Sequence, residues 1–256
     1  MSSAAPLIAV AHGSRDPRSA CVIGGIVDAL AAAHPELEVH VAFLDLSVPS
    51  LRDAVDAVAQ AGYARAVVVP LLLGSAYHSR VDLPALLAEA SARHPGLELV
   101  QAPVLGDDER LVTALRDRIV AAGADIDDPT VGVALSAVGS SSGSANAVTR
   151  SLAARVSAGT AWSGAEVCFA AAEPAVADVI ERLRADGARR ITVGSWFLAP
   201  GLLTERIRRS AATAAPDVLV ADPLGAHALL PQVIVDRYRY ALHSARPAGT
   251  AVSAAA

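Results

Sequence analysis

The chain has 256 residues and a formal net charge of −5, and 53% of its residues are hydrophobic while only 4% are aromatic. Because it lacks a basic stripe and stacking rings, we expect no nucleic-acid partner, and its longest apolar runs are strand-sized, too short to cross a bilayer. The N-terminus lacks the pattern of a secretory signal and two cysteines are too few for a disulfide framework, so we expect a cytoplasmic protein without a membrane partner.

The first half alternates short apolar runs with longer amphipathic ones. We predict strands over residues 7–11, 37–44, 66–73 and 97–104, and helices over residues 18–33, 48–61, 80–93 and 108–122. Such regular alternation is typical of βαβ units, which build parallel sheets. Residues 123–129 are polar and turn-rich, and this stretch is a candidate linker. We therefore predict a first domain over residues 1–124.

The pattern then begins again. We predict strands over residues 130–137, 165–171, 190–198 and 217–221, and helices over residues 144–157, 174–186, 203–213 and 227–243. Residues 11–14 align with residues 137–140, and residues 43–49 align with residues 168–174. The sequence thus indicates an α/β protein of two tandem domains with parallel sheets, related by internal duplication. The second domain is predicted over residues 125–244, and the tail over residues 245–256 is expected to be disordered.

Three polar residues of the first half lie at strand ends: His12, Asp45 and His78. They follow one another at equal intervals, one βα unit apart. Their counterparts in the second half are apolar: Val138, Ala170 and Leu203. A scaffold role would have to be filled in both copies, whereas a catalytic role needs filling in only one. The asymmetry therefore assigns the chemistry to the first half, and we expect Val138 and Leu203 to be structural.

The carboxyl ends of parallel strands meet at one edge of a sheet, where ligands bind in open α/β folds. Two histidines and a carboxylate suit a divalent first-row metal with open coordination positions. Each member has another interpretation: Asp45 as a cap for the following helix, and His78 as a solvated loop residue. Ser14 and Ser79 are expected to be helix caps. Three arginines are either solvated or bind anions: Arg15, Arg18 and Arg80.

Residues 11–18, 43–46 and 70–78 resemble the motifs of the sirohydrochlorin chelatases, which belong to the class II chelatases. The resemblance covers roughly residues 7–242, in the two-domain, single-chain form. It implies two flavodoxin-like domains with a tetrapyrrole between them. The implied reaction is insertion of Fe²⁺ or Co²⁺ into sirohydrochlorin, toward sirohaem or cobalamin, by a lyase that forms nitrogen–metal bonds; ferrochelatase is favoured over cobaltochelatase. The metal is a substrate, and no organic cofactor is implied.

The two family histidines match His12 and His78, while Asp45 stands where the family has a glutamate. The resemblance implies that both histidines bind the metal or accept pyrrole protons, with Asp45 assisting. The carboxylates of sirohydrochlorin would be held by a group of polar residues: Gly13, Ser14, Arg15, Arg18, Ser79 and Arg80. The apolar ring faces would rest on residues 71–73 and 196–198, unless these belong to the core.

Two other functions stay open. A metal or tetrapyrrole carrier of the same fold would need the same ligands as an enzyme. His12-Gly13 also resembles the Arg-His-Gly of histidine phosphatases, but Ala11 stands in place of the arginine. A monomer and a homodimer are both compatible with the sequence.

Overall fold

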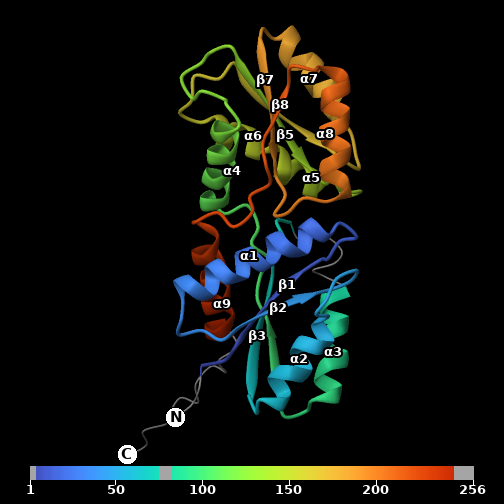
Figure 1. Ribbon diagram of the computed structural model, residues 1–256, viewed down its shortest axis with the longest axis vertical. Helices are drawn as coiled ribbons and strands as arrows, with labels where there is room; N and C mark the ends of the chain where they lie inside the picture. The colour runs from blue at the N-terminus through green and yellow to red at the C-terminus, as the bar shows by residue number, and fades with distance from the viewer. Residues whose placement is uncertain (1–3, 75–81, 245–256) are drawn as a thin grey trace, which may run out of the picture.

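Two four-stranded parallel sheets, with helices on both faces of each, make up the protein (Figure 1). The computed structural model describes residues 4–74 and 82–244; the predicted tail, residues 245–256, lies outside them. The strands are β1 Leu7–Ala11, β2 Val39–Phe43, β3 Arg65–Pro70, β4 Glu98–Gln101, β5 Val131–Ala137, β6 Gly164–Phe169, β7 Arg190–Ser195 and β8 Leu219–Val220. The helices are α1 Pro17–Ala33, α2 Leu51–Gln60, α3 Leu83–Arg93, α4 Glu109–Ala121, α5 Gly143–Arg150, α6 Leu152–Ser157, α7 Val176–Ala185, α8 Leu202–Ala214 and α9 Leu230–Ser244.

The strand order is β2-β1-β3-β4 in the first sheet and β6-β5-β7-β8 in the second, so the predicted α/β class with two parallel sheets is confirmed. Every residue of the inner strands β1 and β5 is buried, as their continuous apolar runs predict. The strands predicted over residues 97–104 and 217–221 are shorter than expected. Both are edge strands that pair on one side only, and β4 leaves the sheet after its last partner of β3.

The two sheets repeat one another in register, which corrects one alignment. Asp45 N donates to His12 O over 3.0 Å, and Ala171 N donates to Val138 O over 2.9 Å. The counterpart of Asp45 is therefore Ala171, not Ala170 as predicted. The loop that follows is one residue shorter in the second half, which shifted the sequence alignment.

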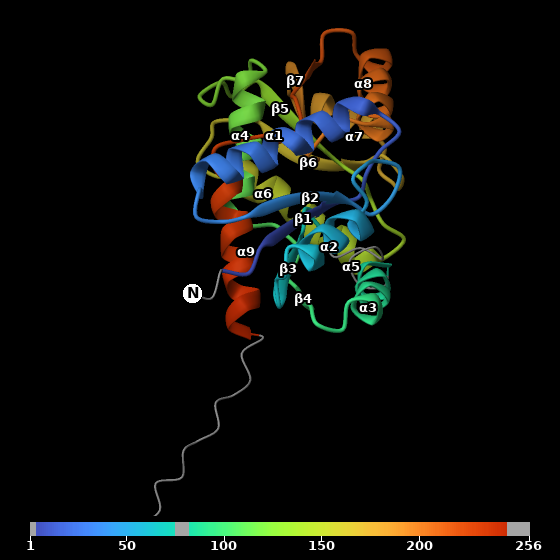
Figure 2. The ribbon, with the colours of Figure 1, turned by 60° about the horizontal axis from the view of Figure 1, so that its bottom comes forward.

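Each lobe takes its last helix from the other half of the chain. Helix α4, from the first half, packs against β7 and α6, while α9, from the second half, packs against β3, β4 and α1 (Figures 1 and 2). Helix α1 lies between the two lobes in both views. The domain boundary at residue 124 remains a prediction. Helices α4 and α9 each pack in the lobe on the other side of that boundary.

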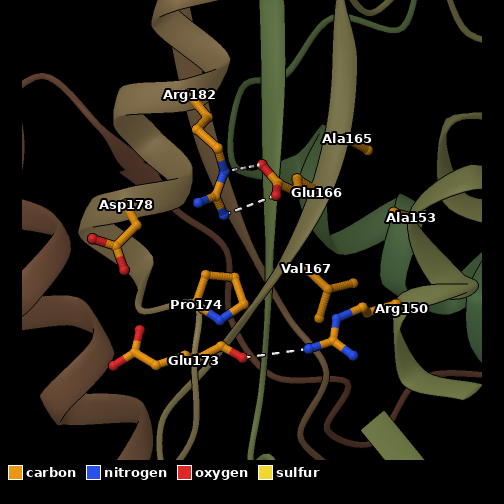
Figure 3. Close-up of a pocket in the computed structure, with 9 residues that line it drawn as sticks. All are labelled: Arg150, Ala153, Ala165, Glu166, Val167, Glu173, Pro174, Asp178 and Arg182. Atoms are coloured by element: carbon orange, nitrogen blue, oxygen red, sulfur yellow. Dashed lines mark hydrogen bonds and ion pairs between the residues drawn. The ribbon is translucent and has the colours of Figure 1, made fainter. Parts of the chain in front are cut away.

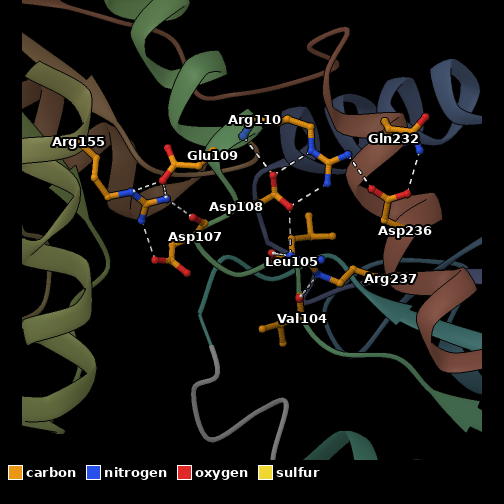
Figure 4. Close-up of polar contacts among 10 residues, drawn as sticks. All are labelled: Val104, Leu105, Asp107, Asp108, Glu109, Arg110, Arg155, Gln232, Asp236 and Arg237. Atoms are coloured by element: carbon orange, nitrogen blue, oxygen red, sulfur yellow. Dashed lines mark hydrogen bonds and ion pairs between the residues drawn. The ribbon is translucent and has the colours of Figure 1, made fainter. Parts of the chain in front are cut away.

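A polar network fixes both exchanged helices at the start of α4 (Figure 4). Asp108 accepts hydrogen bonds from Arg110 Nη2 over 2.9 Å and from Arg237 Nη2 over 3.3 Å. The hydrogen bond from Arg110 is the main reason why the pKa of Asp108 falls to about 2. Arg110 also bridges to Asp236 of α9, and Arg155 of α6 contacts Asp107. The Asp108 carboxylate, at the start of α4, thus joins this helix to α9 from the other half of the chain.

One continuous hydrophobic core runs between the sheets, and a smaller core lies on the outer face of each sheet. The central core joins Leu7 of β1, Leu115 of α4 and Ile234 of α9, all fully buried. A fully buried side chain of this size contributes about 2 kcal/mol of stability through the hydrophobic effect. Packing in this core therefore holds the two lobes together, in addition to the covalent connections of the chain. None of the described helices has the length and apolar content needed to cross a bilayer.

The helix predicted over residues 144–157 is broken at Ser151 into α5 and α6. The Ser151 hydroxyl donates to Val148 O over 2.7 Å, and Ser151 N also points to this carbonyl. A serine that binds the preceding turn in this way competes with the regular helical ladder. The sequence pattern records only the apolar periodicity, so it predicted one helix.

Candidate functional site

The loops that follow β1 and β2 meet at the carboxyl edge of the first sheet. Leu44 N donates to Ala11 O over 2.9 Å, and Asp45 N donates to His12 O over 3.0 Å. The backbones of His12 and Asp45 are therefore joined by a direct hydrogen bond. His12 is half-buried and the Asp45 side chain is exposed. The structure brings these two predicted site residues together from positions far apart in the sequence.

The contact between these loops is tight and has an unusual backbone. Gly13 has a φ of +94°, and a Cβ added to it would lie 1.7 Å from Asp45 O. Leu46 has a φ of +60°, a conformation that residues with a side chain rarely adopt, and its N–H donates to Asp45 Oδ1 over 2.7 Å. Strained residues of this kind gather at functional sites.

Ser47 ties the two loops together through one hydroxyl. Ser47 Oγ accepts from Ser14 N and donates to Ser14 O, each over 3.2 Å. These two hydrogen bonds fix the loop on either side of Gly13 relative to Asp45. Ser47 is not among the predicted site residues, because a lone serine four residues before helix α2 carries no signal of so distant a partner.

Two capping interpretations are wrong. Helix α2 is capped by Ser50, which forms a capping box with Asp53, so Asp45 is not its cap. Helix α1 is capped by Asp16, whose side chain accepts from Arg18 N over 3.0 Å. Ser14 instead accepts from Asp16 N over 3.0 Å, one step before the cap. Among the described residues, the Asp45 carboxylate accepts its hydrogen bond from Leu46 N, within the turn at the sheet edge.

Three predicted site residues lie outside the described residues: His78, Ser79 and Arg80. Within residues 4–74 and 82–244, no three His, Cys, Asp or Glu side chains form a group suited to a metal ion. The predicted trio needs His78 as its third member. The metal site of His12, Asp45 and His78 therefore stays a prediction.

The two described arginines of this loop differ in their surroundings. Arg18 donates to Asp16 over 2.6 Å and to Glu205 of α8 over 2.9 Å, which links α1 to the second lobe. The hydrogen bond from Arg18 lowers the pKa of Asp16. Arg15 is exposed and forms no ion pair with the described carboxylates. Arg15 is thus the more available of the two for an anionic ligand.

Several exposed apolar side chains lie in the segments that follow strands of both sheets. Val138, the counterpart of His12, is 46% exposed and lies outside the core, so its burial does not support the expected structural role. The others are Leu46, Val48 and Leu202. By contrast, Leu71, Trp196 and Leu198 belong to the central core, which favours the core interpretation of these three residues. A valine that ends a buried strand looks like core in the sequence, so the pattern did not reveal its exposure.

A cavity of about 650 Å³ lies in the second lobe between β6, α5, α6 and α7 (Figure 3). Its charged groups already have partners: Arg182 pairs with Glu166 over 2.8 Å, and Arg150 stacks over Phe169 at 5.3 Å from the ring centre. None of the predicted site residues that the structure describes lines it. This cavity is therefore not the site at the β1 and β2 edge.

Two parallel sheets joined by exchanged helices define a two-lobed α/β protein, in which a histidine and an aspartate meet at the edge of the first sheet. A model of the CbiX family matches residues 6–122 and 132–241. The chain belongs to the CbiX family.

Known proteins similar to this chain include chelatases for two different metals. It is 26% identical to the sirohydrochlorin ferrochelatase of Priestia megaterium, over 80% of this chain and 78% of that protein. It is 25% identical to the sirohydrochlorin cobaltochelatase of the same organism, over 77% of this chain and 65% of that protein. The solved structure of SirB from Bacillus subtilis with Fe³⁺ has the same fold, with a TM-score of 0.78 and 23% identity over 93% of this chain and 96% of that one.

Proposed function

We propose that the protein is a chelatase that inserts Fe²⁺ or Co²⁺ into sirohydrochlorin. The observation that carries the proposal is the backbone hydrogen bond between His12 and Asp45 at the sheet edge, in a chain of the CbiX family. The two Priestia megaterium relatives, one named for iron and one for cobalt, are almost equally similar to this chain. The preference for iron expected from the sequence stays a prediction.

In this reaction the metal ion enters the macrocycle and two pyrrole N–H protons leave. A neutral imidazole is suited to both tasks, because it binds first-row metals and exchanges protons near neutral pH. We assign His12 and His78 to holding the incoming ion or accepting the pyrrole protons. Asp45, on a side chain one methylene shorter than glutamate, assists as a carboxylate held beside His12.

The substrate presents flat apolar faces and eight peripheral carboxylates. Val138 and Leu202 of the second lobe, and Leu46 and Val48 of the first, supply exposed apolar surface for the ring faces. Arg15, Arg80 and the polar groups of Gly13, Ser14 and Ser79 would bind carboxylates at the rim. Arg18 joins them if the substrate displaces Glu205 from its guanidinium.

The test is anaerobic mixing of metal-free sirohydrochlorin with Fe²⁺ or Co²⁺ and a small amount of protein, followed by absorbance. We expect many turnovers per chain. His12→Ala and His78→Ala should each slow insertion by about 100-fold or more, with the fold intact. His34→Ala, which removes a histidine paired with Glu36, serves as the matched control. A spectral change of one equivalent, without turnover, would instead identify a carrier.

We also propose that the protein acts in the cytoplasm, as a monomer or a homodimer. The central core already joins both halves of one chain. Sedimentation of the active protein and cell fractionation test these two points.

A further inference from the structure

Two serines occupy neighbouring positions at the carboxyl ends of β5 and β7. Ser136 and Ser195 are partners in the register of the two strands, and they are only 2% and 4% exposed. The pair in the same position of the first sheet is Val10 and Pro70. The second lobe therefore has two buried hydroxyls where the first lobe is apolar, the reverse of the asymmetry at His12.

The two hydroxyls differ in their hydrogen bonds. Ser136 Oγ donates to Gly194 O over 2.9 Å. Ser195 Oγ forms no hydrogen bond within the part of the chain that the structure describes. Ser195 Oγ is not among the described side-chain atoms that are both buried and without a partner, so solvent reaches this hydroxyl from the cavity that Ser195 lines. The Ser195 hydroxyl is therefore available as a donor.

Both serines line a cavity of about 470 Å³ between α1 and the second lobe. Its other polar walls come from α1, α4, α8 and the segment after β8: Arg18, Arg118, Thr204, Glu205, Arg208 and Asp222. The cavity adjoins the loop that follows His12, because Ser14 Oγ lies 3.5 Å from the Cβ position of Gly201, the N-cap residue just before α8.

The charges of this cavity favour an anion. Arg118 donates through Nε and Nη2 to Leu224 O, over 3.1 and 2.8 Å, and pairs with no carboxylate of the described residues. Arg208 is 3.8 Å from Asp222, whose side chain is largely exposed. The N-terminal turn of α8, with Pro200 and Thr204, also lines the cavity and adds the positive end of a 13-residue helix.

We propose that this cavity binds a carboxylate, with the Ser195 hydroxyl and the Arg118 guanidinium as donors. Resting on the proposed function, we assign this carboxylate to a peripheral side chain of the tetrapyrrole held between the lobes. A small free carboxylate such as acetate or citrate has the same chemistry and is the alternative source. The second lobe then orients the macrocycle while the first lobe carries the histidine.

The experiment compares Ser195→Ala with Ser136→Ala. Binding of metal-free sirohydrochlorin is measured by fluorescence without added metal, and stability is measured by urea unfolding. We expect Ser195→Ala to raise Kd about tenfold without loss of stability, as for a lost hydrogen bond to a charged group. Ser136→Ala removes a hydroxyl that already donates to Gly194 O, so it should lower stability and leave Kd within about twofold. Equal Kd values for wild type and Ser195→Ala in this assay exclude the macrocycle as the source.

A second arm measures the thermal shift produced by acetate and by citrate. If these anions stabilise the wild type but not Ser195→Ala, while sirohydrochlorin binding is unchanged, the cavity binds a free carboxylate. If neither assay distinguishes Ser195→Ala from wild type, the cavity proposal is wrong, even when the wild type inserts metal normally. If the wild type fails to insert metal but binds either ligand through Ser195, the cavity stands and the chelatase proposal fails.

Discussion

A Cβ at position 13 would lie 1.7 Å from the carbonyl oxygen of Asp45, so Gly13 and Asp45 are in direct backbone contact. No side chain fits between them. The contact lets the loop after β1 and the loop after β2 touch, and it places His12 beside Asp45. Glycine at this position is thus required both by its positive φ and by the space available.

Gly13→Ala should separate the two loops and weaken Co²⁺ binding at least tenfold, measured by titration calorimetry. Its matched control is Gly62→Ala, because Gly62 has a φ of +81° and no atom within 4 Å of its Cβ position. Both variants pay the conformational penalty of a left-handed alanine, about 1 kcal/mol. Only Gly13→Ala adds the collision. Equal losses of Co²⁺ affinity in the two variants would show that the contact has no role in the site.

Ser47→Ala removes both hydrogen bonds to Ser14 and leaves the helices unchanged. We expect slower metal insertion, by about five- to tenfold, with a loss of stability of about 1–2 kcal/mol. The insertion rate and the urea midpoint measure the two effects. Ser50→Ala, which removes the cap of α2, should cost about 1 kcal/mol of stability and leave the insertion rate alone. A normal rate in Ser47→Ala would mean that the loops hold their positions without this hydroxyl.

Most of the strands and helices could be predicted from the sequence, because continuous apolar runs and amphipathic periods reflect burial directly. The exchange of α4 and α9 could not. Leu115 of α4 and Ile234 of α9 are both buried, and an apolar helix face does not specify which sheet will cover it. The meeting of His12 and Asp45 followed from strand ends, whereas Ser47 depends on a turn conformation that residue types alone do not reveal.

Val138, just after β5, is exposed, whereas Leu135 within β5 is buried, so the two positions should respond differently to substitution. Because its side chain is 46% exposed, Val138→Ala should change stability by less than about 0.5 kcal/mol. Leu135→Ala, in the preceding strand β5 and fully buried, should cost about 2–5 kcal/mol. Val138→Asp should instead weaken binding of metal-free sirohydrochlorin, since it places a negative charge beside an anionic ring. Unchanged binding in Val138→Asp would place the ring elsewhere.

Asp108 should make the joint between α4 and α9 sensitive to acid. Its pKa is about 2 in the folded protein, against an ordinary value of 3.8, mainly because Arg110 donates to its carboxylate. A carboxyl group with a lowered pKa stabilises the fold fully above its unfolded value, and this contribution is lost as the pH falls from about 4 to about 2. The difference amounts to about 2 kcal/mol, since the Asp108 side chain is only 14% exposed.

Asp108→Asn tests whether the charge of Asp108 stabilises the fold and loses this effect in acid, because asparagine keeps the helix cap but not the charge. We expect the variant to be about 2 kcal/mol less stable than wild type at pH 7, with about half of that difference left at pH 3. Urea unfolding at pH 7, 5, 4 and 3 measures it. Asp28→Asn, at an exposed position of α1, should stay within about 0.5 kcal/mol of wild type throughout. A difference that does not shrink toward pH 3 would mean that shape or capping, rather than charge, accounts for the effect of Asp108 on the two exchanged helices.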